Sequence, residues 1–241
     1  MRYTSRRFFP LLILLTILYS CKKSPADLKQ GVWRAVLKTE TATEIPFNFN
    51  VIDSAGKKHL EIINASERFR VDEITIKDDS VIIQMPLFDS EIRTAMKNDK
   101  LYGTWIKHLA DSSVSMEFIA EPDKEWRFFS TKTESKFNVT GKWSTTFVSE
   151  DGKDTIMAVG EFKQTGSKVT GTFLTATGDY RFLQGTVSDQ NLYLSCFDGS
   201  HAYLFTGKLE DNNTISNGKF YSGYSYIENW TAKRDDQAIL P

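Results

Sequence analysis

The stretch from Gly171 to Phe205 reads GTFLTATGDYRFLQGTVSDQNLYLSCFDGSHAYLF, and apolar and polar residues alternate along most of it. A period of two residues is typical of β-strands that bury one face and expose the other. Short polar runs separate the predicted strands 168–176, 180–187, 192–197 and 202–209. The stretch therefore predicts an antiparallel meander, in which each strand pairs with the next.

The same alternation continues on both sides of this meander. The further predicted strands are 31–37, 45–51, 59–63, 69–76, 81–85, 101–107, 114–120, 125–129, 141–147, 157–164, 214–221 and 226–233. Residues 90–97 are the exception, because their pattern suits one or two helical turns. No long apolar repeat with a 3.6-residue period follows residue 20, so the sequence predicts an all-β fold.

Several short motifs occur twice, about 110 residues apart. The pairs are Gly31-Val32-Trp33 with Gly141-Lys142-Trp143, Ala65-Ser66 with Ala176-Thr177, Phe88-Asp89-Ser90 with Phe197-Asp198-Gly199, and Gly103-Thr104-Trp105 with Gly218-Lys219-Phe220. We therefore predict two tandem units, 31–136 and 137–236, each a meander barrel or sandwich of about eight short strands, with 237–241 as a tail. The G-x-W opening looks like the lipocalin and avidin architecture, a resemblance of fold alone.

The N-terminus has the features of a targeting signal. Three arginines (Arg2, Arg6 and Arg7) precede an apolar run at 8–18 that is too short for an ordinary membrane span. Leu18-Tyr19-Ser20-Cys21 follows and resembles the end of a bacterial lipoprotein signal. That resemblance implies removal of residues 1–20, lipidation of Cys21, a tether at 21–30, and an outer-membrane lipoprotein that faces the periplasm. A plain signal peptide or an N-terminal anchor is the alternative.

Composition narrows the chemistry further. The net charge of −1 gives no electrostatic reason to expect nucleic acid as a partner. The two cysteines, Cys21 and Cys196, have neither C-x-x-C nor zinc-ribbon spacing, and a disulfide between them conflicts with lipidation of Cys21. Phosphate-binding loops, nucleophile elbows and zinc spacings are absent from the sequence, so we expect neither cofactor nor metal.

A closer resemblance rests on three runs in the second unit. They are GEFKQTGSKVTGTFLTATGDYRFLQG at 160–185, LSCFDGSHAYLF at 194–205 and W-x-A-x-R at 230–234. Together they resemble the N-terminal region of Bacteroidota periplasmic lipoproteins that continue into a thioredoxin-like, TlpA-like or peroxiredoxin-like reductase domain. The resemblance implies a binding or scaffolding module that partners such a domain. The Trp-Cys-x-x-Cys of that family is absent, so no catalytic residue is transferred.

The second unit also holds the densest polar cluster, formed by Asp179, Tyr180, Arg181, Asp198 and His201. An Asp-x-x-His pair at one rim can act as an acid–base or metal pair, and Arg181 can clamp Asp179 or Asp198 across strands. The alternative is an ordinary turn, in which Asp198 bonds its own backbone.

Two further sets of residues are candidates. Arg68 and Asp89 are the first-unit counterparts of the polar cluster, and Cys196 is either a reactive thiol or a small core residue. Ser54, Ser80 and Thr155 each follow Asp and precede an apolar residue, which resembles the O-glycosylation acceptor of Bacteroidota.

Three functions therefore stay open. The first is the lipid-anchored module associated with a thioredoxin-like protein. The second is a lipocalin-like carrier of a small apolar ligand. A barrel filled by its own aromatic residues would count against this function. The third is a hydrolase or metal enzyme at the Asp198/His201 rim.

Overall fold

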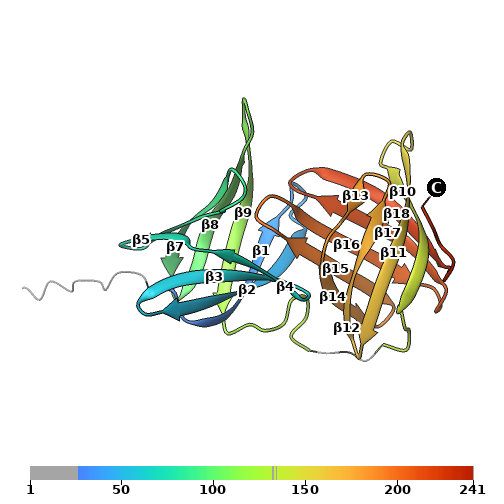
Figure 1. Cartoon of the computed structure of the whole chain (residues 1–241), viewed down its shortest axis with the longest axis horizontal. Coiled ribbons are helices and arrows are strands. Elements are labelled where there is room, and N and C mark those ends of the chain that lie inside the picture. Colours follow the sequence, from blue (N-terminus) through green and yellow to red (C-terminus); the bar gives the residue numbers. More distant parts are fainter. Residues whose placement is uncertain (1–26, 132, 134, 241) are drawn as a thin grey trace, which may run out of the picture.

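The computed structural model describes residues 27–131, 133 and 135–240, and every regular element in that part of the chain is a β-strand. The predicted signal, Cys21 and most of the predicted tether lie outside the described residues. The strands form two nine-stranded antiparallel sheets that stand side by side along the long axis (Figure 1). The predicted all-β fold of two tandem, lipocalin-like units is thereby confirmed.

The first sheet has the order β4-β3-β2-β1-β9-β8-β7-β6-β5. Its strands are β1 (Gly31–Lys38), β2 (Glu44–Ser54), β3 (Lys57–Asn64), β4 (Glu67–Val71), β5 (Glu73–Lys77), β6 (Ser80–Gln84), β7 (Ser90–Lys97), β8 (Lys100–His108) and β9 (Ser113–Pro122). Consecutive strands pair, except that β1 closes onto β9, so the sheet curls until its two edges, β4 and β5, approach each other.

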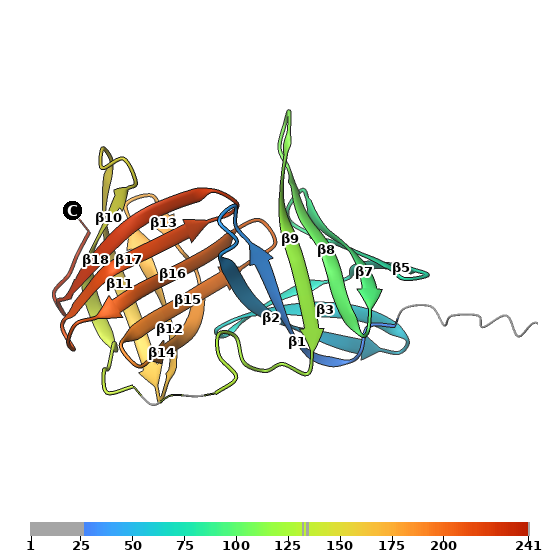
Figure 2. The same ribbon diagram turned by 180° about the vertical axis from the view of Figure 1, so that it is seen from behind.

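The second sheet has the order β11-β10-β18-β17-β16-β15-β14-β12-β13. Its strands are β10 (Gly141–Ser149), β11 (Thr155–Thr165), β12 (Lys168–Thr175), β13 (Gly178–Asp179), β14 (Leu183–Ser188), β15 (Asn191–Phe197), β16 (Ala202–Leu209), β17 (Thr214–Ser222) and β18 (Tyr226–Arg234). An added pairing of β11 with β12 closes this sheet into an eight-stranded barrel. Figure 2 shows the closed wall from behind.

The two units repeat one strand order. β1 corresponds to β10 and β9 to β18, and each repeated motif falls at corresponding places. The Phe-Asp motifs lie at the β6–β7 and β15–β16 turns, and the two Ala-Ser/Thr motifs lie at the β3–β4 and β12–β13 turns. Sequence repetition thus predicted the topological repeat.

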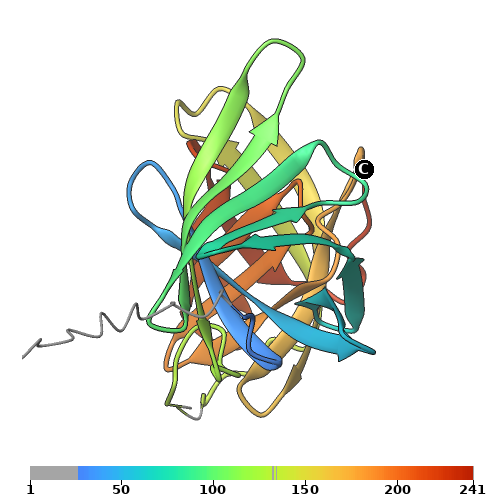
Figure 3. The ribbon, with the colours of Figure 1, turned by 90° about the vertical axis from the view of Figure 1, so that its left-hand side faces the viewer.

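The units differ at one seam of the barrel wall. In the second unit β12 pairs with β14, whereas the corresponding strands β3 and β5 of the first unit only approach each other without pairing. The wall of the first unit therefore has an unpaired edge on each side of this gap. Figure 3 looks along the long axis with the first unit in front.

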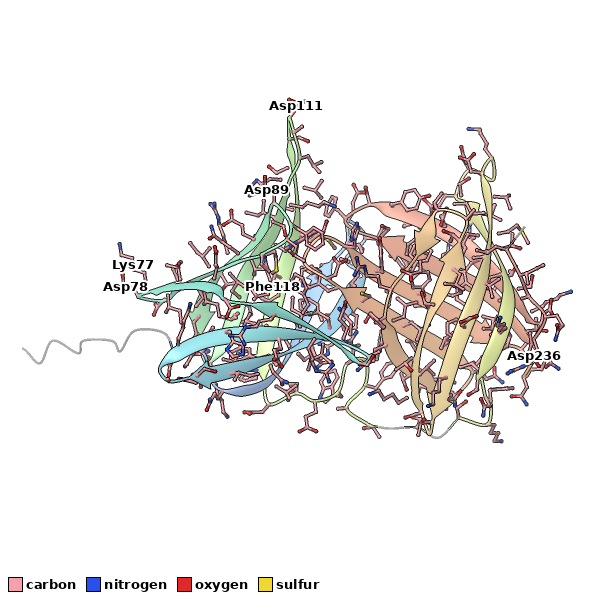
Figure 4. All side chains as sticks on the ribbon, viewed as in Figure 1. Lys77, Asp78, Asp89, Asp111, Phe118 and Asp236 are labelled. Carbon is pink, nitrogen blue, oxygen red and sulfur yellow. The ribbon has the colours of Figure 1, made fainter. Side chains whose placement is uncertain are left out.

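Each unit has its own apolar interior. In the second unit Trp143 and Phe147 alternate with outward residues along β10, as the sequence pattern predicts. Phe118 lies within the first unit, against Phe47 (Figure 4). The first core also takes in Phe197, Ala202 and Leu204 from the second unit, so the first barrel is completed by the second.

Four sequence expectations about local structure were wrong. Residues 90–97 form strand β7 rather than helical turns, because pairing with both β6 and β8 outweighs their helix-compatible composition. Residues 125–129 form an irregular connection whose backbone carbonyls accept side-chain hydrogen bonds from Arg34 and Asn48. Predicted strand 69–76 is interrupted at Asp72, and predicted strand 180–187 begins only at Leu183.

The predicted tether is also shorter than expected at its C-terminal end. Leu28 is fully buried in the first core, and Lys29 offers its carbonyl oxygen to the Trp33 indole nitrogen at 2.8 Å. Residues 28–30 therefore belong to the barrel.

Candidate functional site

The β15–β16 turn, Phe197–Ala202, leaves the second barrel and enters the first unit. The Phe197 ring lies 4.4 Å from the Phe47 ring and 5.7 Å from the Trp105 ring, measured between centroids. All three rings are buried. We call this segment the wedge.

Side chains of the first unit bind the wedge backbone. Trp105 Nε1 donates to the carbonyl oxygen of Gly199 at 3.1 Å, and the Ser90 hydroxyl donates to the same oxygen. Asn64 forms a reciprocal pair with Phe197: its Nδ2 donates to the carbonyl at 2.8 Å and its Oδ1 accepts from the amide at 3.3 Å. Hydrogen bonds therefore hold the wedge in its position in the first unit, in addition to apolar contacts.

Asp198 and His201 lie together, as the sequence predicted, but their bonds serve the turn. Asp198 Oδ1 accepts from the amides of Ser200 (2.9 Å) and His201 (2.7 Å), and Oδ2 lies 3.0 Å from His201 Nδ1. Burial acts to raise the pKa of Asp198, yet these hydrogen bonds together outweigh it and the net pKa is lowered. The carboxylate is thus held charged inside a turn that it stabilises itself.

Arg181 was expected to clamp Asp179 or Asp198, and the side-chain part of that expectation was wrong. Its guanidinium lies 3.8 Å from Glu67 of the first unit, while Asp179 Oδ1 accepts from the Arg181 backbone amide at 3.1 Å. Arg181 has a φ of 56°, a left-handed conformation that interrupts the predicted strand. The predicted cluster is therefore divided between the wedge and an exposed bend.

The two first-unit candidates are exposed and separate from the wedge contacts. Arg68 folds back onto the carbonyl oxygens of Ala65 and Glu67, at 3.1 Å and 2.7 Å. Asp89 lies at the edge of the first unit (Figure 4), and its carbonyl oxygen accepts from the His108 amide at 2.8 Å. Neither side chain joins the Asp198–His201 pair.

Arg127 is a buried residue that sequence reasoning missed. It is 5 % exposed and lies between the units, where it donates to the carbonyl oxygens of Ile63 and Ser195, the latter at 3.0 Å. Burial lowers its pKa to about 10, and no carboxylate of the described residues pairs with it. A charged residue between aromatic neighbours in the run Glu125–Phe129 was the only available signal.

Cys196 lies beside this arginine and behaves as a core residue. It is 1 % exposed, and burial, with a smaller effect of Asp198, raises the pKa of its thiol to about 12. A thiol that stays protonated is a poor nucleophile.

The interior of the second barrel is filled by aromatic rings. Phe205 stacks on Phe220 with centroids 4.3 Å apart, and Phe173 lies 4.8 Å from Phe205. At the end nearest the first unit the rings become tyrosines, and Glu228 lies among them. A large apolar ligand inside this barrel would have to displace these rings.

Two surface grooves flank the contact between the units. One, of about 930 Å³, lies between the Ala65-Ser66 turn and the outer face of β10–β12, beside Arg181 and Phe182. The other, of about 660 Å³, runs under the connection 125–135. Both carry mixed polar and apolar side chains.

The three glycosylation candidates, Ser54, Ser80 and Thr155, are exposed at strand ends. They are accessible to a modifying enzyme, and the modification itself stays a prediction. Among the described residues no group of three potential metal ligands occurs. None of these residues forms a helix that is long and apolar enough to cross a membrane.

No protein-family model and no curated protein sequence matches this chain. Among solved structures it is similar to the crystal structure of a protein of unknown function from the DUF3598 family of Nostoc punctiforme PCC 73102. The alignment covers 86% of this chain and 97% of that one, with 8% sequence identity and a TM-score of 0.31. A likeness of this degree carries no functional assignment.

Proposed function

We propose that the protein is a lipid-anchored, non-catalytic binding or scaffolding module on the periplasmic face of the outer membrane. Its two barrels act as one body, and its partner is a thioredoxin-like reductase. The proposal that the protein is non-catalytic rests on one observation: the side chains that could carry out chemistry instead have structural roles. Asp198 stabilises its own turn, Cys196 lies in the core of the second barrel, and Arg127 lies in the buried contact between the units.

The anchor and the partner are supported by sequence. The basic start, the short apolar run and Leu18-Tyr19-Ser20-Cys21 support lipidation. The first described residues lead into the first barrel at Leu28, so a short link from Cys21 would hold the barrels close to the membrane. The runs at 160–185 and 194–205 support the thioredoxin-like partner.

A Cys21→Ser variant tests the anchor. We expect it to leave the membrane fraction, whereas the matched variant Cys196→Ser stays there because its thiol lies in the core. Intact mass of the membrane-bound protein should exceed the mass of the processed peptide by that of the acyl chains. Membrane retention of Cys21→Ser would exclude the anchor.

Thiol chemistry tests the non-catalytic role. A thiol-specific reagent should leave Cys196 unmodified in the folded protein and label it after denaturation, because its pKa is about 12 and it is buried. The isolated chain should not reduce insulin. Steady turnover that disappears in Cys196→Ser would overturn the assignment.

In-cell cross-linking tests the partner. We expect cross-linked peptides that join the two barrels to a protein with Trp-Cys-x-x-Cys, from cells in which Cys21 is intact. Cross-links that lead only to proteins without that motif would remove the thioredoxin association while leaving the anchor untouched.

The two rival functions have less support in the geometry. Aromatic rings occupy the second barrel, which counts against a carrier of a small apolar ligand in its interior. The Asp198 carboxylate accepts hydrogen bonds from two backbone amides and lies within hydrogen-bond distance of a histidine nitrogen, which leaves it little capacity as a general base.

A further inference from the structure

Glu228 points into the second barrel from strand β18, at the end that carries the tyrosines. It is 2 % exposed, and it alternates along the strand with the inward residues Trp230 and Ala232. A buried carboxylate is costly unless a cation or several hydrogen bonds compensate its charge.

The other buried carboxylates of the described residues have such compensation. Glu91 lies 2.6 Å from Arg93 and 3.3 Å from His108. Asp198 has His201 and two backbone amides. Glu228 has only the Tyr226 hydroxyl, which donates to Oε1 at 2.8 Å, and no ion pair with any described lysine, arginine or histidine.

The second carboxylate oxygen of Glu228 has no hydrogen-bond partner among the described residues and keeps a small contact with solvent. Among the described residues, Trp230 Nε1 is the one side-chain nitrogen or oxygen that is both sealed from solvent and without a hydrogen-bond partner. The unpartnered oxygen of Glu228 does not belong to this class. This oxygen is therefore not sealed, and Tyr226 beside it is 52 % exposed.

Aromatic rings surround this carboxylate. Tyr180 lies 5.0 Å from Phe220 and 5.4 Å from Tyr203, and Phe220 lies 6.4 Å from Tyr226, measured between centroids. Burial, with Glu228 as a further cause, raises the pKa of Tyr180 and of Tyr226 to about 12 each. Both phenols therefore stay neutral, and neutral aromatic rings attract cations over their faces.

We propose that Glu228 and the surrounding rings of Tyr180, Phe220 and Tyr226 bind an organic ammonium group that enters at this end of the second barrel. The ammonium group would supply the positive partner that the Glu228 carboxylate lacks among the described residues. The rings would add cation–π contacts in a partly desolvated site. This goes beyond the proposed function, since it needs neither the anchor nor the reductase partner.

Calorimetric titration of the folded chain with choline and with butylammonium tests the proposal. We expect at least one of them to bind, with the Glu228→Gln variant and the neutral tert-butyl analogue of choline each weaker by about tenfold or more. The matched variant Glu150→Gln, which removes an exposed charge from the neighbouring β10–β11 turn, should bind like the wild type.

A second measurement separates binding from folding. Glu228→Gln should melt at the same temperature as the wild type or higher, because it removes a buried charge that lacks a cation. Butylammonium binding without choline binding supports a primary ammonium site, and the reverse supports a quaternary one. Absence of binding by both at millimolar concentration, or equal affinity of the wild type and Glu228→Gln, would overturn the proposal.

Discussion

Asp198 and Asp89 occupy corresponding turns of the two units, but only the Asp198 side chain stabilises its turn. The Asp198 carboxylate closes the β15–β16 turn, whereas the corresponding Asp89 is exposed and its side chain accepts no hydrogen bond from the described residues. The difference follows from position, because the β15–β16 turn is buried in the neighbouring unit and must satisfy its polar groups internally.

An Asp198→Asn variant should be less stable than the wild type by about 1–3 kcal/mol at neutral pH, because it loses charge-assisted hydrogen bonds. The pKa of Asp198 is lowered in the folded state, so its contribution is present above the ordinary value of 3.8 and is lost as the pH falls through the folded pKa. The difference between wild type and variant should therefore shrink as the pH falls below 3.8. Urea denaturation at neutral pH and at about pH 3 measures it.

Asp89→Asn is the matched control for this variant. It makes the same chemical change at the corresponding exposed turn, so its stability should match the wild type at both pH values. A constant deficit for Asp198→Asn across that range would show that the charge of Asp198 does not stabilise the turn.

At the scale of elements, the tryptophan that opens each barrel is fixed in the same way. Trp33 Nε1 donates to the Lys29 carbonyl and Trp143 Nε1 to the Val139 carbonyl, each four residues earlier. In the second unit Arg234, at the end of β18, lies 4.7 Å over the Trp143 ring. Arg234 thus adds a side-chain contact between the first and last strands of the second barrel, β10 and β18.

Arg234→Lys should be a damaging substitution. The guanidinium donates to three backbone carbonyls, of Asn212, Asn138 and Thr140, and a lysine cannot reproduce this planar arrangement. We expect a loss of about 1–3 kcal/mol and a melting temperature lower by several degrees. Arg93→Lys keeps a positive charge beside Glu91 and changes a side chain that is itself exposed, so it should change little. Equal melting of both variants would contradict this account.

Sequence periodicity predicted the elements well and their ends less well. The strand at Trp143 was predictable because inward and outward residues alternate there without interruption. The left-handed bend at Arg181 was not, because it is imposed by pairing of β12 with both β13 and β14. The spacing of Asp198 and His201 predicted that they lie together. The burial of Asp198 was not predictable, because it depends on contact with the first unit, which no local pattern describes.

At the scale of the whole molecule, the wedge joins two folding units. Phe197 from the second unit fills the first core, and Arg127 from the connection binds carbonyls of both units. The first barrel has a gap between β3 and β5, while the second is closed by its own strands. The first unit should therefore depend on the second more than the reverse.

Calorimetry of Phe197→Ala tests this dependence. The wild type should unfold in one transition, and the variant in two, with the first unit melting earlier after a loss of about 3–5 kcal/mol. Phe205→Ala removes an equally buried ring from the second core and should lower the whole transition instead. Two transitions in the wild type would contradict the coupling.

The meeting of the two Phe-Asp turns also restricts how the chain can evolve. Gly199 has a φ of 98°, and a β-carbon there would lie 3.1 Å from the side chain of Met85, at the corresponding turn of the other unit. A duplication normally frees one copy to diverge, but here each copy forms part of the surroundings of the other. Among descendants of the same duplication, we expect the residues at positions 85 and 199 to change together.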